Sequence, residues 1–171
     1  TVRMFPLPYI LDILKTLMER KTKTVKFLDR TFNADTNYLT SILDFIENNN
    51  ICTTFQFEIV VDRLTKELIE KIGNYQKSNL RFEIGIQSTN ILANKAVYRI
   101  QDNEKLFHNI KLIQQAEIID LHLDLIAGLP YEDYNSFIKT FDEVISLRSK
   151  ELQLGFLKLL KGTKLYQEKD I

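Results

Sequence analysis

The chain has 171 residues, which is enough for one domain with its own core, and 44% of them are hydrophobic. Its 23 basic and 23 acidic residues give a formal net charge of +0, so we expect no nucleic-acid partner. Every apolar run is short and interrupted by charge, so we expect no membrane span. The single cysteine, Cys52, excludes an internal disulfide and fits a reducing cytoplasm, so we expect one cytoplasmic domain over residues 1–171.

The first residue is Thr1 rather than Met, and no signal-peptide pattern follows it. We therefore expect further residues upstream in the natural protein. Pro6 and Pro8 precede an apolar-periodic run over residues 9–18, which predicts a helix. We expect this helix to follow a strand that lies before Thr1.

Five β-rich runs follow along the chain, separated by stretches with helical spacing. The predicted strands cover residues 25–29, 54–60, 80–87, 119–127 and 152–160. Their starts are roughly 30 residues apart, which is the size of a βαβ unit with a right-handed crossover, so the strands should be parallel. An open doubly wound sheet and an incomplete barrel both satisfy this α/β pattern.

Polar residues gather at the predicted carboxyl ends of four strands, where parallel α/β folds bind their ligands. These segments are Leu28-Asp29-Arg30-Thr31, Glu58, Gly85-Ile86-Gln87-Ser88 and Asp124-Leu125-Ile126-Ala127-Gly128-Leu129-Pro130. Asp120 and His122 fall on the alternating face of the fourth predicted strand, and we expect them to pack there rather than to bind a metal.

The third and fourth of these segments resemble the core of the radical S-adenosylmethionine (radical SAM) superfamily. The resemblance is to the branch with oxygen-independent coproporphyrinogen oxidases, methylthiotransferases and cobalamin-dependent radical SAM enzymes. Arg99 falls between the two segments, in the order and approximate spacing of the family. The resemblance covers nearly the whole chain and favours the barrel. It implies a TIM-like partial barrel, with about five parallel strands of a (β/α)6 core.

The same resemblance implies two cofactors, S-adenosylmethionine and a 4Fe-4S cluster. In this family a Cys-x-x-x-Cys-x-x-Cys loop holds the cluster, and the sequence contains no such motif. Cys52 lies in a predicted turn before a strand, at the end of the sheet opposite the expected site. We therefore expect the cluster loop upstream of Thr1, and we expect this chain alone to be inactive. An upstream cobalamin-binding domain is compatible with the resemblance.

The resemblance also assigns contacts with S-adenosylmethionine to individual residues. Glu58 and Gln87 match positions that contact its ribose or its amino acid portion. Arg99 matches a residue that pairs with its carboxylate, and Asp124 matches one near the nucleoside. A guanidinium suits a carboxylate, and carboxylates accept hydrogen bonds from hydroxyl and ammonium groups.

Three further contacts are implied at the first and last predicted strands. Thr31 matches a segment whose backbone often contacts the methionyl ammonium. Asp29-Arg30-Thr31 lacks the glycines that are usual there, and Asp29 offers an alternative contact with the ammonium. Leu159 lies in the stretch whose backbone usually borders the adenine. The sequence does not indicate the substrate.

Two other functions stay open. Asp29, Glu58, Glu83 and Asp124 could act as oxygen ligands for Mg²⁺ or Mn²⁺ in a metal-dependent hydrolase. Alternatively, the chain could be a non-catalytic α/β interaction module. The free edge of the strand over residues 25–29 predicts either association with another copy or cover by the residues before Tyr9.

Overall fold

The computed structural model describes residues 3–116 and 118–168. Within them, five strands form one sheet in the order β1-β2-β3-β4-β5. Its strands are β1 (Thr24–Lys26), β2 (Thr54–Glu58), β3 (Asn79–Gln87), β4 (Ile119–Ala127) and β5 (Glu151–Phe156). The α-helices are α1 (Leu7–Glu19), α2 (Thr36–Asn49), α3 (Lys66–Gly73), α4 (Ile91–Ala96), α5 (Asn103–Gln114), α6 (Tyr134–Ile145) and α7 (Lys164–Gln167). Two single-turn 3-10 helices are η1 (Phe32–Ala34) and η2 (Val61–Arg63).

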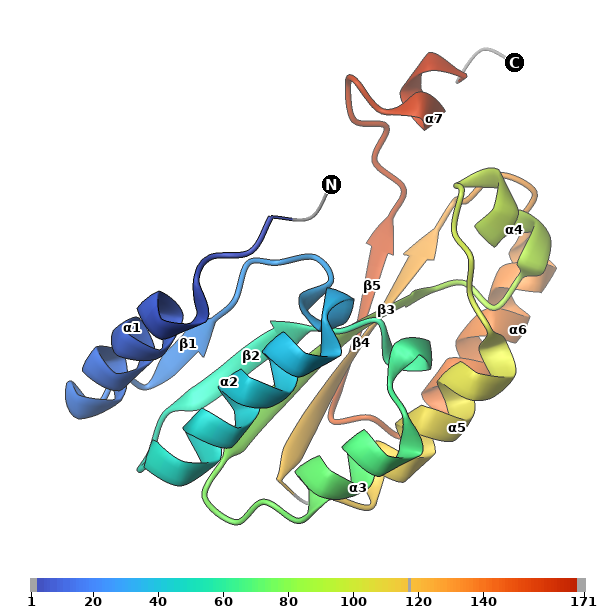
Figure 1. Cartoon of the computed structure of the whole chain (residues 1–171). Helices are drawn as coiled ribbons and strands as arrows, with labels where there is room; N and C mark the ends of the chain where they lie inside the picture. The colour runs from blue at the N-terminus through green and yellow to red at the C-terminus, as the bar shows by residue number, and fades with distance from the viewer. Residues whose placement is uncertain (1–2, 117, 169–171) are drawn as a thin grey trace.

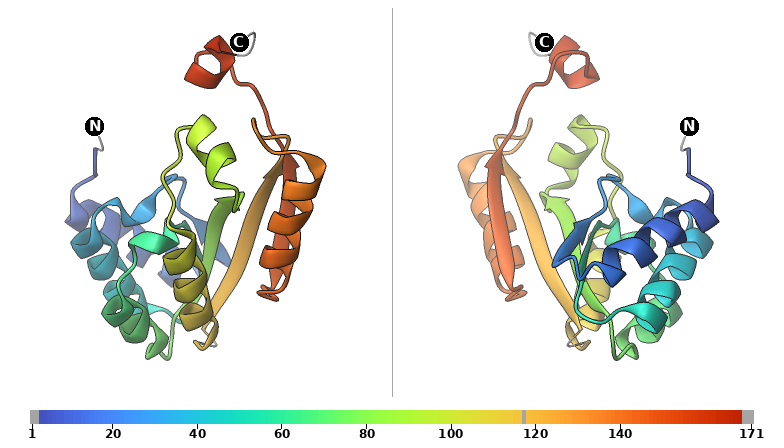
Figure 2. Two further views of the ribbon diagram at one scale, coloured as in Figure 1. Left: turned by 90° about the vertical axis from the view of Figure 1, so that its right-hand side faces the viewer. Right: turned by 90° about the vertical axis from the view of Figure 1, so that its left-hand side faces the viewer.

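The order of the strands decides between a doubly wound sheet and a partial barrel. All neighbouring strands are parallel, and each crossover leads to the next strand in the same direction. Right-handed crossovers of this kind place every connecting helix on one face, whereas a doubly wound sheet reverses direction and covers both faces. Helices α2, α3, α5 and α6 accordingly follow one side of the curved sheet (Figures 1 and 2). The predicted α/β, TIM-like partial barrel is confirmed.

Side chains alternate between two environments along β2, β3 and β4. The positions that face the helices are apolar and buried, and the positions between them are half-buried and mostly polar. The buried set is Phe55, Phe57, Leu80, Phe82, Ile84, Ile86, Ile119, Leu121, Leu123 and Leu125. The hydrophobic core therefore lies between the sheet and its helices. Each large apolar side chain buried there contributes about 1.5–3 kcal/mol to folding.

Three predicted strand ends are wrong. β2 stops at Glu58 rather than at residue 60, and β1 stops at Lys26 rather than at residue 29. On the edge strand, Phe27 N–H still donates to Gln56 O at 3.0 Å, but the residues after it are exposed. β5 stops at Phe156 rather than at residue 160, because its partner β4 turns away at Gly128, where φ is +85°. Asp29 and Leu159 therefore lie in loops rather than at strand ends.

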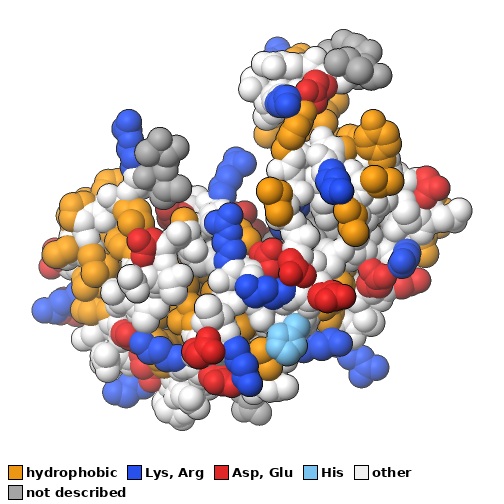
Figure 3. All heavy atoms as spheres, turned by 45° about the vertical axis from the view of Figure 1, so that its right-hand side comes forward, with side chains coloured by type: hydrophobic (Ala, Val, Ile, Leu, Met, Phe, Trp, Pro, Cys, Tyr) orange, Lys and Arg blue, Asp and Glu red, His pale blue; other side chains and the backbone are white. Residues whose placement is uncertain are grey.

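β1 forms an edge of the sheet in the described part of the chain, since it pairs only with β2. The segment before α1 is tied to α2, where Tyr38 Oη donates to Phe5 O at 3.1 Å. Exposed apolar side chains gather over this segment and α1, and again over α4 and the segment after β5 (Figure 3). Association of the β1 edge with another copy stays a prediction. No helix within the described residues has the length and hydrophobicity needed to cross a membrane.

The loop that leads into β3 is held by one carboxylate on α2. Glu47 accepts hydrogen bonds from the N–H groups of Gln76, Lys77 and Ser78 at 2.8, 3.1 and 2.9 Å, and from Ser78 Oγ at 2.7 Å. Burial alone would raise the pKa of Glu47, but these hydrogen bonds outweigh it and lower the pKa. The same bonds fix the start of the strand that carries Gly85 and Gln87 at its far end.

We expect Glu47→Gln to lower the free energy of unfolding by about 1–3 kcal/mol at neutral pH, because a neutral amide replaces a charged acceptor of several hydrogen bonds. A carboxyl whose pKa is lowered in the folded state stabilises the fold above its unfolded pKa, and this contribution is lost as pH falls through the folded pKa. Urea denaturation should therefore show a difference between wild type and variant that shrinks in acid. Glu70→Gln, at an exposed pair with Lys66, is the control and should change little. Equal stability of Glu47→Gln and wild type at neutral pH would contradict this role.

Candidate functional site

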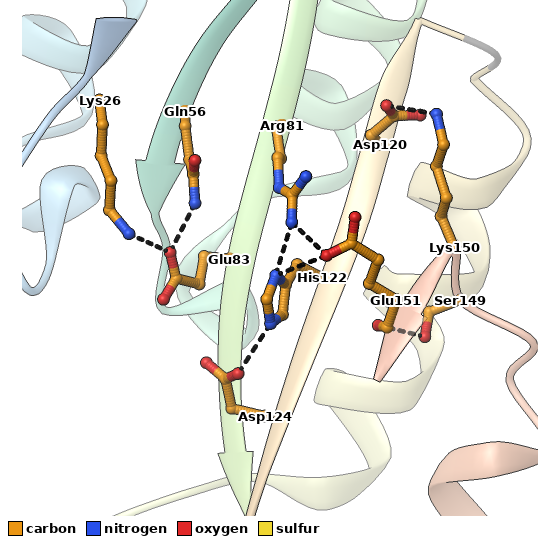
Figure 4. A network of polar contacts seen from close by, with 10 residues as sticks. All are labelled: Lys26, Gln56, Arg81, Glu83, Asp120, His122, Asp124, Ser149, Lys150 and Glu151. Atoms are coloured by element: carbon orange, nitrogen blue, oxygen red, sulfur yellow. Dashed lines mark hydrogen bonds and ion pairs between the residues drawn. The ribbon is translucent and has the colours of Figure 1, made fainter. Parts of the chain in front are cut away.

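The face of the sheet without helices carries polar side chains from all five strands, and we call it the polar face. Its members are Lys26, Gln56, Glu58, Arg81, Glu83, Gln87, Asp120, His122, Asp124 and Glu151, with Gly85 among them. Figure 4 shows most of these side chains on the same side of the sheet, with the helices behind it. The register places Glu58, Glu83, His122 and Glu151 side by side, and places Gly85 and Asp124 one level nearer the carboxyl ends.

A first polar network centres on Glu83, in the middle of the sheet. The Glu83 carboxylate accepts from Lys26 Nζ at 2.8 Å and from Gln56 Nε2 at 2.7 Å. Burial alone would raise the pKa of Glu83, but these two donors outweigh it and lower the pKa. Both donors reach the same oxygen, Oε2, so Glu83 is a carboxylate whose ionised form is favoured by protein donors on one side.

A second network runs from β3 through β4 to β5. Arg81 Nη2 donates to His122 Nδ1 at 2.8 Å and also to the Glu151 carboxylate. On the other side of the imidazole, His122 Nε2 lies 3.1 Å from Asp124 Oδ1, which is within ion-pair distance but is not aligned as a hydrogen bond. This chain of contacts links the middle of the polar face to its carboxyl edge (Figure 4).

Two other carboxyls of the polar face differ from Glu83, namely Glu58, which lies beside it, and Asp124, which lies one level nearer the carboxyl ends. Burial raises the pKa of Glu58, and the negative charges of Glu83 and Asp124 raise it further. Burial also raises the pKa of Asp124, with His122 opposing the shift. In both groups the effect of burial outweighs that of the nearby positive charges. A ligand that brings a cation or hydrogen-bond donors would favour their ionised forms.

Gly85 gives Gln87 the room to fold back over the polar face. A Cβ at Gly85 would collide with Gln87 Nε2. The β3–β4 register shifts between Gly85 and Gln87, and Gln87 has a φ of +66°, so a bulge turns its side chain back toward Gly85. Gln87 Oε1 is buried and meets no partner in the described part of the chain. The spacing Gly-x-Gln therefore has a steric reason, and it leaves one acceptor unsatisfied.

Arg99 reaches the same edge from the connection between α4 and α5. Its Nη2 donates to Gly85 O, and its Nε donates to Gln101 Oε1 at 2.8 Å. The connection is anchored at the end of β3, because Asn94 Nδ2 and Gln101 Nε2 both donate to Ser88 O, at 2.9 and 3.0 Å. The sequence between the two motifs thus folds so that a guanidinium lies over Gly85.

The electrostatic setting of Arg99 is unusual for a partly buried cation. Burial lowers its pKa, and the charges of Asp62 and Glu58 only partly offset this effect. Within residues 3–116 and 118–168, no carboxylate lies within ion-pair distance of its guanidinium. Partly buried guanidinium groups are normally paired, so this one is suited to a carboxylate that comes from a ligand.

The structure therefore brings Glu58, Gln87, Arg99 and Asp124 to the carboxyl-terminal end of the sheet. It does not bring the other three predicted contacts into hydrogen bonds or ion pairs with them, as far as the described residues show. Asp29 is exposed in the loop after β1, Thr31 Oγ1 donates to Arg30 O, and Leu159 is half-exposed beyond β5. Their contacts with the cofactor stay predictions, as do those of the first four.

Sequence reasoning missed most of the second network. Arg81 and Glu151 were not singled out, and His122 was expected only to pack on the alternating face. His122 does lie on that face, but it lies between a guanidinium and a carboxylate. A usable signal was present in the strictly alternating polar residues of β3 and β4. Charged residues repeated at a period of two indicate a polar face with its own networks rather than isolated salt bridges.

The described residues contain no group of three or more His, Cys, Asp or Glu side chains arranged to hold a metal ion. Asp29, Glu58, Glu83 and Asp124, the oxygen ligands of the hydrolase alternative, do not form such a group there. Cys52 is exposed in the turn before β2, at the amino end of the sheet, as predicted. A groove of about 750 Å³ lies on the helix side and is lined mainly by α5 and α6 residues such as Phe107, Lys111 and Lys139, away from the polar face.

No family model matches the sequence. The chain is 31% identical over 90 residues to an oxygen-independent coproporphyrinogen III oxidase of Helicobacter pylori, and the match covers 53% of this chain and 19% of that protein. It is 34% identical over 74 residues to the enzyme of the same name from Pseudomonas aeruginosa, with 43% and 16% covered. The chain thus spans less than a fifth of the length of these curated relatives.

Solved structures of radical SAM enzymes share the fold. The coproporphyrinogen III oxidase HemN from Escherichia coli, described as a radical SAM enzyme, superposes with a TM-score of 0.72 at 18% identity, over 95% of this chain and 40% of that one. The radical SAM methyltransferase TsrM from Kitasatospora setae superposes with a TM-score of 0.77 at 12% identity, over 88% and 31%. The resemblance to the radical SAM core that the two motifs predicted is confirmed.

We expect Asp124→Asn to lower the pKa of the Glu58 carboxyl, because the substitution removes a negative charge that raises it. Carboxyl ¹³C chemical shifts followed through a pH titration would measure the change. Asp29→Asn is the control, since Asp29 lies outside this group of carboxyls and should leave the pKa of Glu58 where it is. A Glu58 that responds equally to both substitutions, or to neither, would contradict the electrostatic coupling between Asp124 and Glu58.

Proposed function

We propose that this chain forms the S-adenosylmethionine-binding part of a radical SAM enzyme. The observation that carries the proposal is the partly buried guanidinium of Arg99, which contacts Gly85 O near the carboxyl ends of a parallel sheet and has no carboxylate within ion-pair distance among the described residues. This is the edge where ligands of parallel α/β folds bind. The confirmed resemblance to the radical SAM core agrees with this location.

The four residues fit the chemical groups of S-adenosylmethionine. Its carboxylate suits Arg99, which can donate through the rigid fork of a guanidinium. Its ammonium and ribose hydroxyls are donors, and they suit the carboxyls of Glu58 and Asp124 together with the unpartnered Gln87 Oε1. The sulfonium adds a positive charge near two carboxyls whose pKa values are raised mainly by burial, and this charge favours their ionised forms.

A 4Fe-4S cluster does not fit the residues of this chain, because three thiolates are needed and the sequence contains one cysteine. We propose that residues outside these 171 supply the cluster, which would provide the electron for cleavage of S-adenosylmethionine to a 5'-deoxyadenosyl radical. The residues of this chain bind the methionine and ribose portions and orient them. TsrM is described with cobalamin bound. We propose that a cobalamin-binding domain of this protein would lie outside this chain.

We expect Arg99→Met to weaken S-adenosylmethionine binding to the natural full-length protein by about 10- to 100-fold, because a charge-assisted contact is worth about 1.5–3 kcal/mol. Isothermal titration calorimetry would measure the affinity. Asp120→Asn is the matched control, since Asp120 lies on the polar face but pairs with Lys150 at 2.6 Å in an exposed position. Affinity should also fall as pH decreases through the raised pKa values of Glu58 and Asp124. Equal affinities in both variants would contradict the proposed site.

The location of the cluster ligands is tested separately. After anaerobic incubation with iron and sulfide, the natural full-length protein should gain the brown absorbance of a 4Fe-4S cluster, whereas these 171 residues alone should not. The control is Cys52→Ser in the full-length protein, which should keep the cluster because Cys52 lies at the opposite end of the sheet. A cluster held by the 171 residues, with cleavage of S-adenosylmethionine under reductant, would overturn this part of the proposal.

A further inference from the structure

We infer that His122 is a positioning residue that orients the Asp124 carboxyl through a proton on Nε2, and that Arg81 fixes the proton there. The inference deepens the proposed function and rests on it, because it assigns a supporting residue to the S-adenosylmethionine site. His122 itself is placed behind Asp124, one level further from the carboxyl edge.

The tautomer of His122 follows from its partner. A guanidinium can only donate hydrogen bonds, so His122 Nδ1, which lies 2.8 Å from Arg81 Nη2, must be the acceptor and carry no proton. The proton of the neutral ring is then on Nε2. That nitrogen is buried, and the polar atom beside it is Asp124 Oδ1 at 3.1 Å. Neutral His122 is therefore an N–H donor aimed at the predicted ligand carboxyl.

Arg81 holds this arrangement because its position is itself fixed. The two protons on Nη2 serve two acceptors, His122 Nδ1 and the Glu151 carboxylate. Glu151 also lies 3.3 Å from His122 Nδ1, so a proton on that nitrogen would have an acceptor in Glu151 but would face the Arg81 donor. The charged groups around the imidazole are thus Arg81, Glu151, Asp124 and, across the β3–β4 pairing, Glu83.

The contact between His122 and Asp124 is close but poorly aligned in this ligand-free chain. Neither atom has another hydrogen-bond partner in the described residues, and both are shut off from solvent. Hydrogen bonds at functional sites often tighten only when the ligand is bound. A ligand hydroxyl that draws the Asp124 carboxylate into place would align Oδ1 with the Nε2 proton, which leaves Oδ2 free to accept from the ligand.

Two substitutions of His122 separate positioning from packing. In His122→Gln the side-chain amide nitrogen takes the place of Nε2, so a donor to Asp124 is kept. In His122→Asn the amide reaches only as far as Nδ1, so the donor is lost. In the natural full-length protein, we expect S-adenosylmethionine affinity within about threefold of wild type for His122→Gln and about tenfold weaker for His122→Asn. Asp120→Asn, on the same strand and face, is the control that should match wild type.

The pH profile distinguishes positioning from a general structural defect. Without the Nε2 donor, the neutral form of Asp124 is favoured, so affinity should be lost at a higher pH in His122→Asn than in wild type. A structural defect would lower affinity by the same factor at every pH. Equal profiles of the Asn and Gln variants would overturn the inference.

Two measurements on the ligand-free protein test the tautomer of His122 and its effect on the pKa of Asp124 directly. Ring ¹⁵N chemical shifts should show His122 as the Nε2–H tautomer in wild type, and should show loss of that preference in Arg81→Met. The pKa of Asp124 from carboxyl ¹³C shifts should be higher in His122→Asn than in His122→Gln. An Nδ1–H tautomer in wild type, or equal pKa values, would overturn the inference, whereas failure of S-adenosylmethionine to bind would count against the proposed function alone.

Discussion

The whole arrangement depends on one constraint, which is that the long helices of the four crossovers, α2, α3, α5 and α6, cover the same face of the sheet. Because the strands follow chain order with parallel crossovers, alternate side chains of β2, β3 and β4 enter a single apolar core. The side chains between them cannot be buried by those helices, so they form a second, polar surface. Packing and function are thereby separated onto two faces of the same strands, at a period of two residues.

The half-buried charged groups of the polar face need protein partners, because water does not reach them on every side. Near the middle of the strands these partners are present, since Glu83 accepts hydrogen bonds from Lys26 and Gln56, and Glu151 accepts one from Arg81. Toward the carboxyl ends of the strands, fewer hydrogen-bond and ion-pair partners are present among the described residues. Gln87 Oε1 has no partner there, and the charged groups around Asp124 and Arg99 only partly offset the effect of burial on their pKa values. Unsatisfied groups at one edge of an otherwise satisfied surface indicate where a ligand completes the network.

The sequence predicted the architecture well because hydrophobic alternation and strand spacing are local signals. β4 has the predicted bounds, and Glu58, Gln87 and Asp124 lie in the last part of their strands. The ends of β1 and β5 were wrong, because strand length at a sheet edge depends on where the neighbour turns away, as β4 does at Gly128. The Arg81–His122–Asp124 contacts were missed because they join residues of neighbouring strands, which sequence spacing does not register.

The central claim is that S-adenosylmethionine binds at the carboxyl edge of the polar face. Hydrogen–deuterium exchange of the natural full-length protein, with and without S-adenosylmethionine, tests it most directly. We predict slower exchange on ligand addition in residues 85–88, 97–101 and 124–129, and no change around Phe107 and Lys139 in the groove between α5 and α6. Protection confined to that groove, or no protection at saturating ligand, would contradict the account.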